Sequence, residues 1–190
     1  MRSSRSCLVI VCAGFLFMMT GCSAESGPED SIQTFFPIEG GEESRAFAAA
    51  GSFVGPNGQH CTGTLVSDRL VLTAAHCFGL NPQPDITEME FVLGTDIEEP
   101  SLRSGLAAAH VHPEFNPSNF DLNAKDLAVV ELSTPITSVM PVVVHFGDAD
   151  ALIGRDMILV GYGRTASDYN PGIRRHATVT VAATTQTKLR

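Results

Sequence analysis

A histidine and a cysteine stand side by side in the segment LTAAHC, residues 72 to 77. Histidine exchanges protons near neutral pH, so His76 has the chemistry of a general base. Histidine and cysteine also ligate metal ions, and a histidine among apolar residues is often part of a core. The segment alone therefore leaves three interpretations open: a proton relay, a metal site or a structural histidine.

An aspartate suited to assist such a base lies fifty positions later, in the segment KDLAVVEL, residues 125 to 132. A buried carboxylate that accepts the Nδ1–H of a histidine holds the ring in one tautomer and stabilises the imidazolium. Asp126 precedes a run of apolar and β-branched residues that is typical of a strand. Taken by itself, it fits a solvated charge at a strand edge equally well.

The first 21 residues are predicted to be a signal peptide of the lipoprotein type. Two arginines, Arg2 and Arg5, precede a charge-free apolar run of thirteen residues, CLVIVCAGFLFMM. That length is typical of a signal-peptide core and is short for a membrane span. The run ends in MTGC, which resembles the bacterial lipobox, so Cys22 is the predicted lipidation site. An ordinary secretory signal cut nearby is the alternative.

The predicted leader sets the compartment. Acyl chains on Cys22 would anchor the protein to a membrane without spanning it. Ser23 follows the cysteine, which in bacterial lipoproteins favours the outer membrane. We therefore expect an exported protein, either a bacterial outer-membrane or periplasmic lipoprotein or a secreted one. Residues 22–37 are mostly polar and are predicted to be a linker or pro-segment.

Two cysteines remain for the folded domain, Cys61 and Cys77. An exported chain with one such pair is expected to form one disulfide. The alternative is a metal site built from these cysteines and His76. Adjacent residues rarely converge on one ion, and no nearby spacing supplies a fourth ligand, so we predict no metal and no cofactor.

The charge balance argues against nucleic acid as a partner. The formal net charge is −9, and Lys and Arg form no basic patch along the chain. Short apolar or β-branched runs recur between turn residues, without helical periodicity beyond one turn near residues 74–78. This pattern predicts an all-β chain of many short strands, folded as a barrel or a sandwich. The runs are TLVS, RLVLTAA, MEFVLG, GLAAAHVH, LAVVEL, MILVGYG and ATVTVAA.

The segment CTGTLVSDRLVLTAAHC, residues 61–77, resembles the first barrel of the trypsin/chymotrypsin family of serine endopeptidases. KDLAVVEL is similar to the strand that carries the family's catalytic aspartate, and LVGYG to the strand that opens its second barrel. IEGG is similar to the N-terminus formed on activation, which makes Ile38 the candidate activation N-terminus. The resemblance implies a double Greek-key β-barrel over residues 38–190. It also implies that His76 and Asp126 are catalytic and that Cys61 pairs with Cys77.

The chain departs from the family in two places. No Gly-Asp-Ser-Gly-Gly motif and no Gly-x-Ser-x-Gly motif occurs, so we find no nucleophilic serine. The resemblance then implies that the domain is C-terminally incomplete, with the first barrel whole, the second only begun, and the oxyanion hole and specificity pocket missing. The other departure is Pro37 before Ile38, where relatives usually have Arg or Lys.

Two functions are expected from these residues. The first is a serine-type endopeptidase of protein or peptide substrates, with little activity in the 190 residues because the nucleophile is missing. The second is a non-catalytic exported lipoprotein that binds a protein partner.

Overall fold

Antiparallel strands make up nearly all the regular structure of the described residues. The structure is a computed structural model that describes residues 41–79, 82–118, 125–164 and 171–183. Within these ranges the helices are single 3₁₀ turns, so the all-β prediction is confirmed. They are η1 (Ala75–Cys77), η2 (Ile86–Glu88) and η3 (Ala149–Leu152). No helix in the described part has the length and apolar character needed to cross a membrane.

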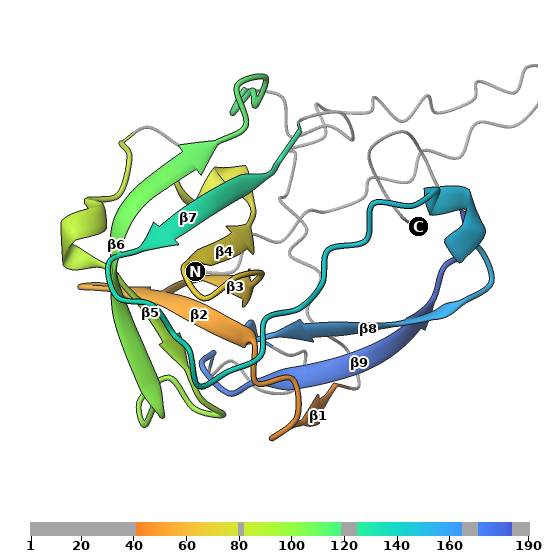
Figure 1. The fold of residues 1–190 in the computed structure, drawn as a ribbon, viewed down its shortest axis with the longest axis horizontal. Coiled ribbons are helices and arrows are strands. Elements are labelled where there is room, and N and C mark those ends of the chain that lie inside the picture. Colours follow the sequence, from red (N-terminus) through yellow and green to blue (C-terminus); the bar gives the residue numbers. More distant parts are fainter. Residues whose placement is uncertain (1–40, 80–81, 119–124, 165–170, 184–190) are drawn as a thin grey trace, which may run out of the picture. The chain divides into compact units, whose positions relative to one another are not determined.

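Six strands close into a barrel in the order β2-β3-β4-β7-β6-β5 (Figure 1). All six neighbouring pairs of strands in the barrel are antiparallel. A tight turn at Pro56 and Asn57 joins β2 to β3, and Gly58 follows it with a φ of 93° that favours glycine. The bounds are β2 Ala50–Gly55, β3 Gly58–Leu65, β4 Leu70–Thr73, β5 Glu90–Leu93, β6 Leu102–Val111 and β7 Ala128–Leu132.

Alternate residues of β4 and β7 face the barrel interior, whereas β2 and β5 bury consecutive residues. In β7 the side chains of Ala128, Val130 and Leu132 are buried, whereas the two residues between them are less so. This period of two is what a strand with one face on a core requires. The same core contains the fully buried Phe53 and Phe91, whose ring centroids lie 5.1 Å apart. Burial of each such side chain stabilises the barrel by about 1.5–3 kcal/mol.

Gly63 on β3 is needed for this packing. A Cβ at that position would lie 2.6 Å from Val71 Cγ1 and 2.8 Å from Phe53 Cε2. We therefore expect Gly63→Ala to lower the free energy of unfolding by about 1–3 kcal/mol through overpacking, measured by urea unfolding. Gly163→Ala is the matched control, because its Cβ would meet no atom within 4 Å. Equal stability of the two variants would contradict this account of the core.

The remaining strands form a separate antiparallel sheet in the order β1-β9-β8 (Figure 1). The strands are β8 (Asp156–Gly161), β9 (Arg175–Thr180) and the two-residue β1 (Glu42–Glu43). In the part of the chain that the structure describes, this sheet has three strands and is not closed. A closed first barrel followed by a partial second sheet agrees with the predicted architecture.

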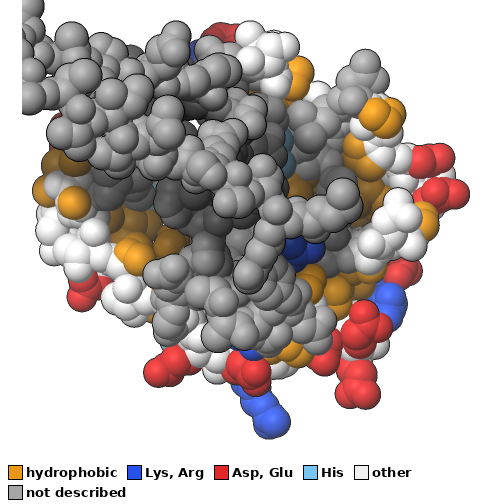
Figure 2. All heavy atoms as spheres, turned by 180° about the vertical axis from the view of Figure 1, so that it is seen from behind, with side chains coloured by type: hydrophobic (Ala, Val, Ile, Leu, Met, Phe, Trp, Pro, Cys, Tyr) orange, Lys and Arg blue, Asp and Glu red, His pale blue; other side chains and the backbone are white. Residues whose placement is uncertain are grey.

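Acidic side chains outnumber basic ones on the face that Figure 2 shows, which is the back of the molecule as drawn in Figure 1. Figure 2 shows Asp and Glu side chains along the rim of that face, with only a few Lys and Arg among them. This distribution follows from the formal net charge of −9. A surface of this sign repels the phosphate backbone of nucleic acids.

Candidate active site

The pairing of β4 with β7 brings His76 and Asp126 together. Thr73, the last residue of β4, lies opposite Ala128, the first residue of β7. The strands are antiparallel, so the chain leaving β4 and the chain entering β7 meet at the same end of the barrel. His76 follows Thr73 by three residues within η1, and Asp126 precedes Ala128 by two. The register therefore places residues fifty positions apart side by side.

The carboxylate of Asp126 holds His76 at two points. Oδ1 accepts a hydrogen bond of 2.7 Å from the backbone N–H of His76, and Oδ2 lies 2.7 Å from its Nδ1. A carboxylate has no proton to donate near neutral pH, so the neutral ring carries its proton on Nδ1. About 44% of the His76 side chain and 35% of the Asp126 side chain are exposed. In this tautomer Nε2 is the ring nitrogen that carries the lone pair, the atom that a base uses.

The turn that carries His76 is fixed to the barrel by a disulfide. Cys77 lies in η1 and Cys61 in β3, and their sulfur atoms are bonded, with the Cα atoms 6.2 Å apart. The hydroxyl of Thr73 donates to the carbonyl of Thr62 at 2.9 Å, which ties the end of β4 to the same strand. Phe78 packs edge-on against Phe53 in the core, with centroids 5.1 Å apart. The disulfide expected from the cysteine count is present.

A metal site at this turn would compete with the disulfide. The ligand atoms of Cys61, His76 and Cys77 lie within 4.8 Å of one another. Zinc binds cysteine as the thiolate, and two thiolates are unavailable while the sulfur atoms are bonded to each other. The disulfide and a three-ligand metal site are therefore mutually exclusive states of these residues.

Lys125, the residue before Asp126, has a structural role that the sequence pattern did not predict. Lys125 has a φ of 47°, a left-handed conformation that is uncommon for residues other than glycine, asparagine and aspartate. Its Nζ pairs with the carboxylate of Glu114, which lies in the turn after β6. The N–H of His112 donates to the carbonyl of Leu127 at 2.9 Å. These contacts anchor the segment that presents Asp126, and only the charge signs of Lys125 and Glu114 hint at them in the sequence.

The Lys125 ammonium lowers the pKa of Glu114 below its ordinary value of 4.5, first by hydrogen bonding and then by charge attraction. We expect Lys125→Met to raise the pKa of Glu114 toward that value, measured by NMR titration of the side-chain carboxyl carbon. Lys125→Arg, which keeps the charge, should leave it low. Because the folded-state pKa is depressed, the pair's contribution to stability is present above the unfolded pKa. It is lost as pH falls through the folded pKa. A pKa unchanged by Lys125→Met would contradict the pairing.

Tyr162 in the predicted LVGYG segment connects the second sheet to the barrel. Its side chain is fully buried, and its hydroxyl lies in hydrogen-bonding distance of the carbonyls of Ala50 and Gly94. Its backbone N–H donates to the hydroxyl of Thr62 at 3.2 Å. Burial raises the pKa of the Tyr162 phenol, so it stays protonated as a donor near neutral pH.

Two predicted site residues, Cys22 and Ile38, lie outside the described residues.

Comparison with known proteins gives one family. A family model described as Trypsin matches residues 38–189. The chain therefore belongs to the trypsin family, a class of serine proteases.

Individual relatives agree with this assignment. Serine protease 7 of Drosophila melanogaster is 28% identical over 125 residues, covering 56% of this chain and 32% of that protein. Transmembrane protease serine 11E of Mus musculus is 25% identical over 152 residues, covering 77% and 35%. Inactive serine protease scarface of Drosophila melanogaster is 29% identical over 128 residues, covering 64% and 19%. The chain thus spans about a third or less of the length of these relatives.

Proposed function

We propose that this chain supplies the catalytic histidine of an exported serine-type endopeptidase and the aspartate that orients it. The observation that carries the proposal is the double hydrogen bond from His76 to Asp126, through the backbone N–H and Nδ1, each at 2.7 Å. A serine hydroxyl is a weak nucleophile near neutral pH and needs a positioned base. A histidine fixed in the Nδ1–H tautomer presents Nε2 to such a hydroxyl.

The proposed reaction uses His76 twice. Nε2 takes the proton of the attacking serine hydroxyl as the oxygen bonds to the scissile carbonyl carbon. The imidazolium that forms is stabilised by the carboxylate of Asp126, which keeps its own charge. Nε2 then returns the proton to the departing amine, which leaves an acyl-enzyme that water hydrolyses in the same way. Substrates of this chemistry are proteins or peptides.

The nucleophile is the missing part of the proposal. The 190 residues contain no Gly-Asp-Ser-Gly-Gly motif, so we place the serine, the oxyanion hole and the specificity pocket in coding sequence downstream of Arg190. Two proteins test this: the 190-residue chain and the product of the gene read past residue 190. We expect a fluorophosphonate probe, which reacts with activated serines, to label only the longer protein. A labelled 190-residue chain would contradict the assignment of roles.

A non-catalytic protein is the second candidate. One relative at 29% identity is named an inactive serine protease, so loss of activity occurs among relatives of this chain. This candidate is a lipoprotein that binds a protein partner through the barrel. It gains support if no reading frame after Arg190 encodes a segment like Gly-Asp-Ser-Gly-Gly and no form of the protein is labelled. Labelling of the longer product excludes it.

Membrane anchoring through Cys22 is a separate proposal. It rests on the apolar leader followed by MTGC and then by Ser23. We expect a bacterial host that expresses the protein to incorporate labelled palmitate, and Cys22→Ser to lose all of the label. Cys12→Ser, inside the leader, is the matched control and should keep it. Equal labelling of the two variants would contradict lipidation at Cys22.

A further inference from the structure

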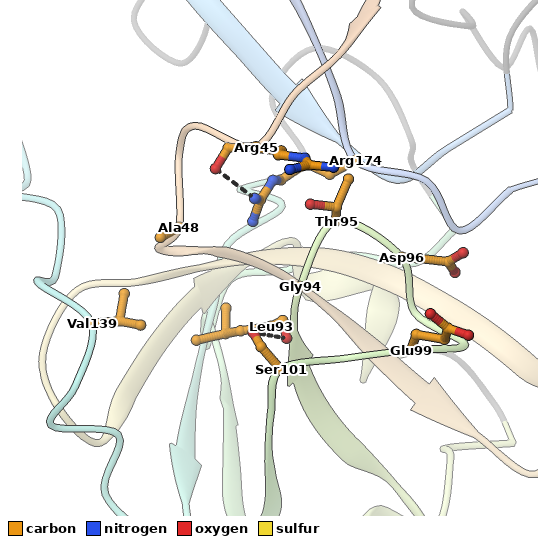
Figure 3. A pocket seen from close by; sticks show the side chains of 10 residues that line it. All are labelled: Arg45, Ala48, Leu93, Gly94, Thr95, Asp96, Glu99, Ser101, Val139 and Arg174. Carbon is orange, nitrogen blue, oxygen red and sulfur yellow. Dashed lines mark hydrogen bonds between the residues drawn. The ribbon is translucent and has the colours of Figure 1, made fainter.

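A second site lies apart from His76 and Asp126. A pocket of about 460 Å³ opens between the chain that leads into β2, the turn after β5 and the chain that leads into β9 (Figure 3). Neither His76 nor Asp126 lines it. Its volume is in the range of pockets that hold small molecules. Arg45 and Arg174 form one side of it, and Asp96 and Glu99 form another.

Among the described residues, Arg174 is a buried cation without a carboxylate partner. Its side chain is only 3% exposed, yet within the described ranges no carboxylate oxygen lies within 4 Å of its guanidinium. Buried charges in proteins are normally paired, because an uncompensated one is costly. Its hydrogen bonds go to neutral oxygens instead. These acceptors are the carbonyls of Ser44, Arg45 and Ala50 and the hydroxyl of Tyr162.

One N–H group of Arg174 is left over by these bonds. A guanidinium has five N–H donors, and Nε, Nη1 and Nη2 use four of them on the neutral oxygens. Arg45 lines the same side of the pocket, and its guanidinium has no ion pair among the described residues. Arg174 and Arg45 therefore bring two positive charges to the lining of the pocket, and guanidinium groups suit a carboxylate.

The lining of the pocket also carries negative charge. Asp96 and Glu99 line it, and neither forms an ion pair with an arginine in the described part of the chain. These carboxylates repel a simple anion, which offsets part of its attraction to the arginines. The aliphatic side chains of Leu93 and Val139 also line the pocket, below the arginines and on the far side from Asp96 and Glu99 in Figure 3. The pocket thus presents positive, apolar and negative surface to one ligand.

We propose that this pocket binds a small zwitterion with an aliphatic side chain, an α-amino acid or a short peptide with free termini. The carboxylate lies against Arg174 and Arg45, and the ammonium group lies against Asp96 and Glu99. The aliphatic group packs on Leu93 and Val139. The proposal does not rest on the endopeptidase function, because the pocket and the His76–Asp126 pair share no residue.

The experiment is calorimetric titration of the 190-residue chain with ligands that share the aliphatic side chain of leucine and differ in their charged groups. The zwitterions are leucine and leucyl-leucine, and the half-charged analogues are isovalerate, which lacks the ammonium, and isoamylamine, which lacks the carboxylate. We expect saturable binding of at least one zwitterion and about tenfold weaker binding of each analogue, since each loses charge-assisted hydrogen bonds. No saturable binding of either zwitterion at millimolar concentration overturns the proposal. So does isovalerate that binds as tightly as the zwitterions.

Variants assign the binding to this pocket. Arg45→Gln and Glu99→Gln remove exposed charges that line it and should each weaken zwitterion binding about tenfold. Arg103→Gln and Glu98→Gln are the matched controls, because neither residue lines the pocket. Arg174 is left intact, since its bonds to the main chain hold the fold together. Equal affinity of the lining variants and the controls would overturn the assignment.

Discussion

Asp126→Asn should lower kcat by about 10⁴-fold in the protein that carries the serine, with little change in fold. An asparagine amide fills the same volume as the carboxylate but can donate a proton to Nδ1 of His76. The ring would then carry its own proton on Nε2, where it cannot accept one from a serine. The measurement is the rate of peptide hydrolysis, or of fluorophosphonate labelling, for the two proteins.

Two comparisons make this result specific to the tautomer. Asp85→Asn changes a carboxylate whose hydrogen bonds go to Thr87, and it should leave kcat unchanged because asparagine caps a helical turn as well as aspartate. Because asparagine keeps the shape of aspartate, the free energy of unfolding of Asp126→Asn, measured by urea unfolding, should stay within about 1 kcal/mol of the parent value. If Asp126→Asn retained activity within about tenfold of the parent protein, Asp126 would not be the group that orients the base.

Removal of the disulfide has the largest expected effect on stability. The Cys61→Ala/Cys77→Ala double variant should lose roughly 3 kcal/mol of unfolding free energy, the loop-entropy estimate for a loop of this size. Cys61 and Cys77 are 16 residues apart in the sequence, and the loop between them contains the whole of β4. The measurement is urea unfolding of the double variant and the parent chain under the same non-reducing conditions.

The reduced parent chain is the control for the double variant. Both proteins lack the cross-link, so both should unfold at nearly the same urea concentration, well below that of the oxidised chain. The reduced chain isolates the cross-link because it keeps both sulfur atoms, whereas truncation of the buried Cys77 in the alanine variant also adds a small cavity. An oxidised chain no more stable than these two would show that the disulfide does not hold the His76 turn in place.

Several strands of the barrel were predictable because they are short apolar or β-branched runs between turn residues, and β4 and β7 bury alternate residues. The apolar runs RLVLTAA and LAVVEL correspond to β4 and β7, and the turn expected near residues 74–78 is η1. The prediction that His76 and Asp126 lie close together came from the resemblance to known proteases. The residues alone did not fix it, because it depends on the pairing of Thr73 with Ala128. A register between strands fifty residues apart leaves no local mark in the sequence.

Other features depend on contacts that no local pattern encodes. The two residues of β1 pair with β9, and Glu42 and Glu43 have no strand propensity to suggest it. The buried position of Arg174 was also unexpected, since arginine is almost never buried without a partner. The pairing of Lys125 with Glu114 joins the residues before β7 to the turn after β6. Each of these contacts arises only when the whole chain is folded.

The tautomer of His76 tests the central claim most directly, and it needs no nucleophile. The measurement is ¹⁵N NMR of the imidazole nitrogens of the labelled 190-residue chain, at a pH above the titration of the ring. The account predicts a protonated Nδ1 and an unprotonated Nε2, because Oδ2 of Asp126 lies 2.7 Å from Nδ1. Asp126→Asn should invert the two signals. A ring that carries its proton on Nε2 in the parent chain would contradict the account.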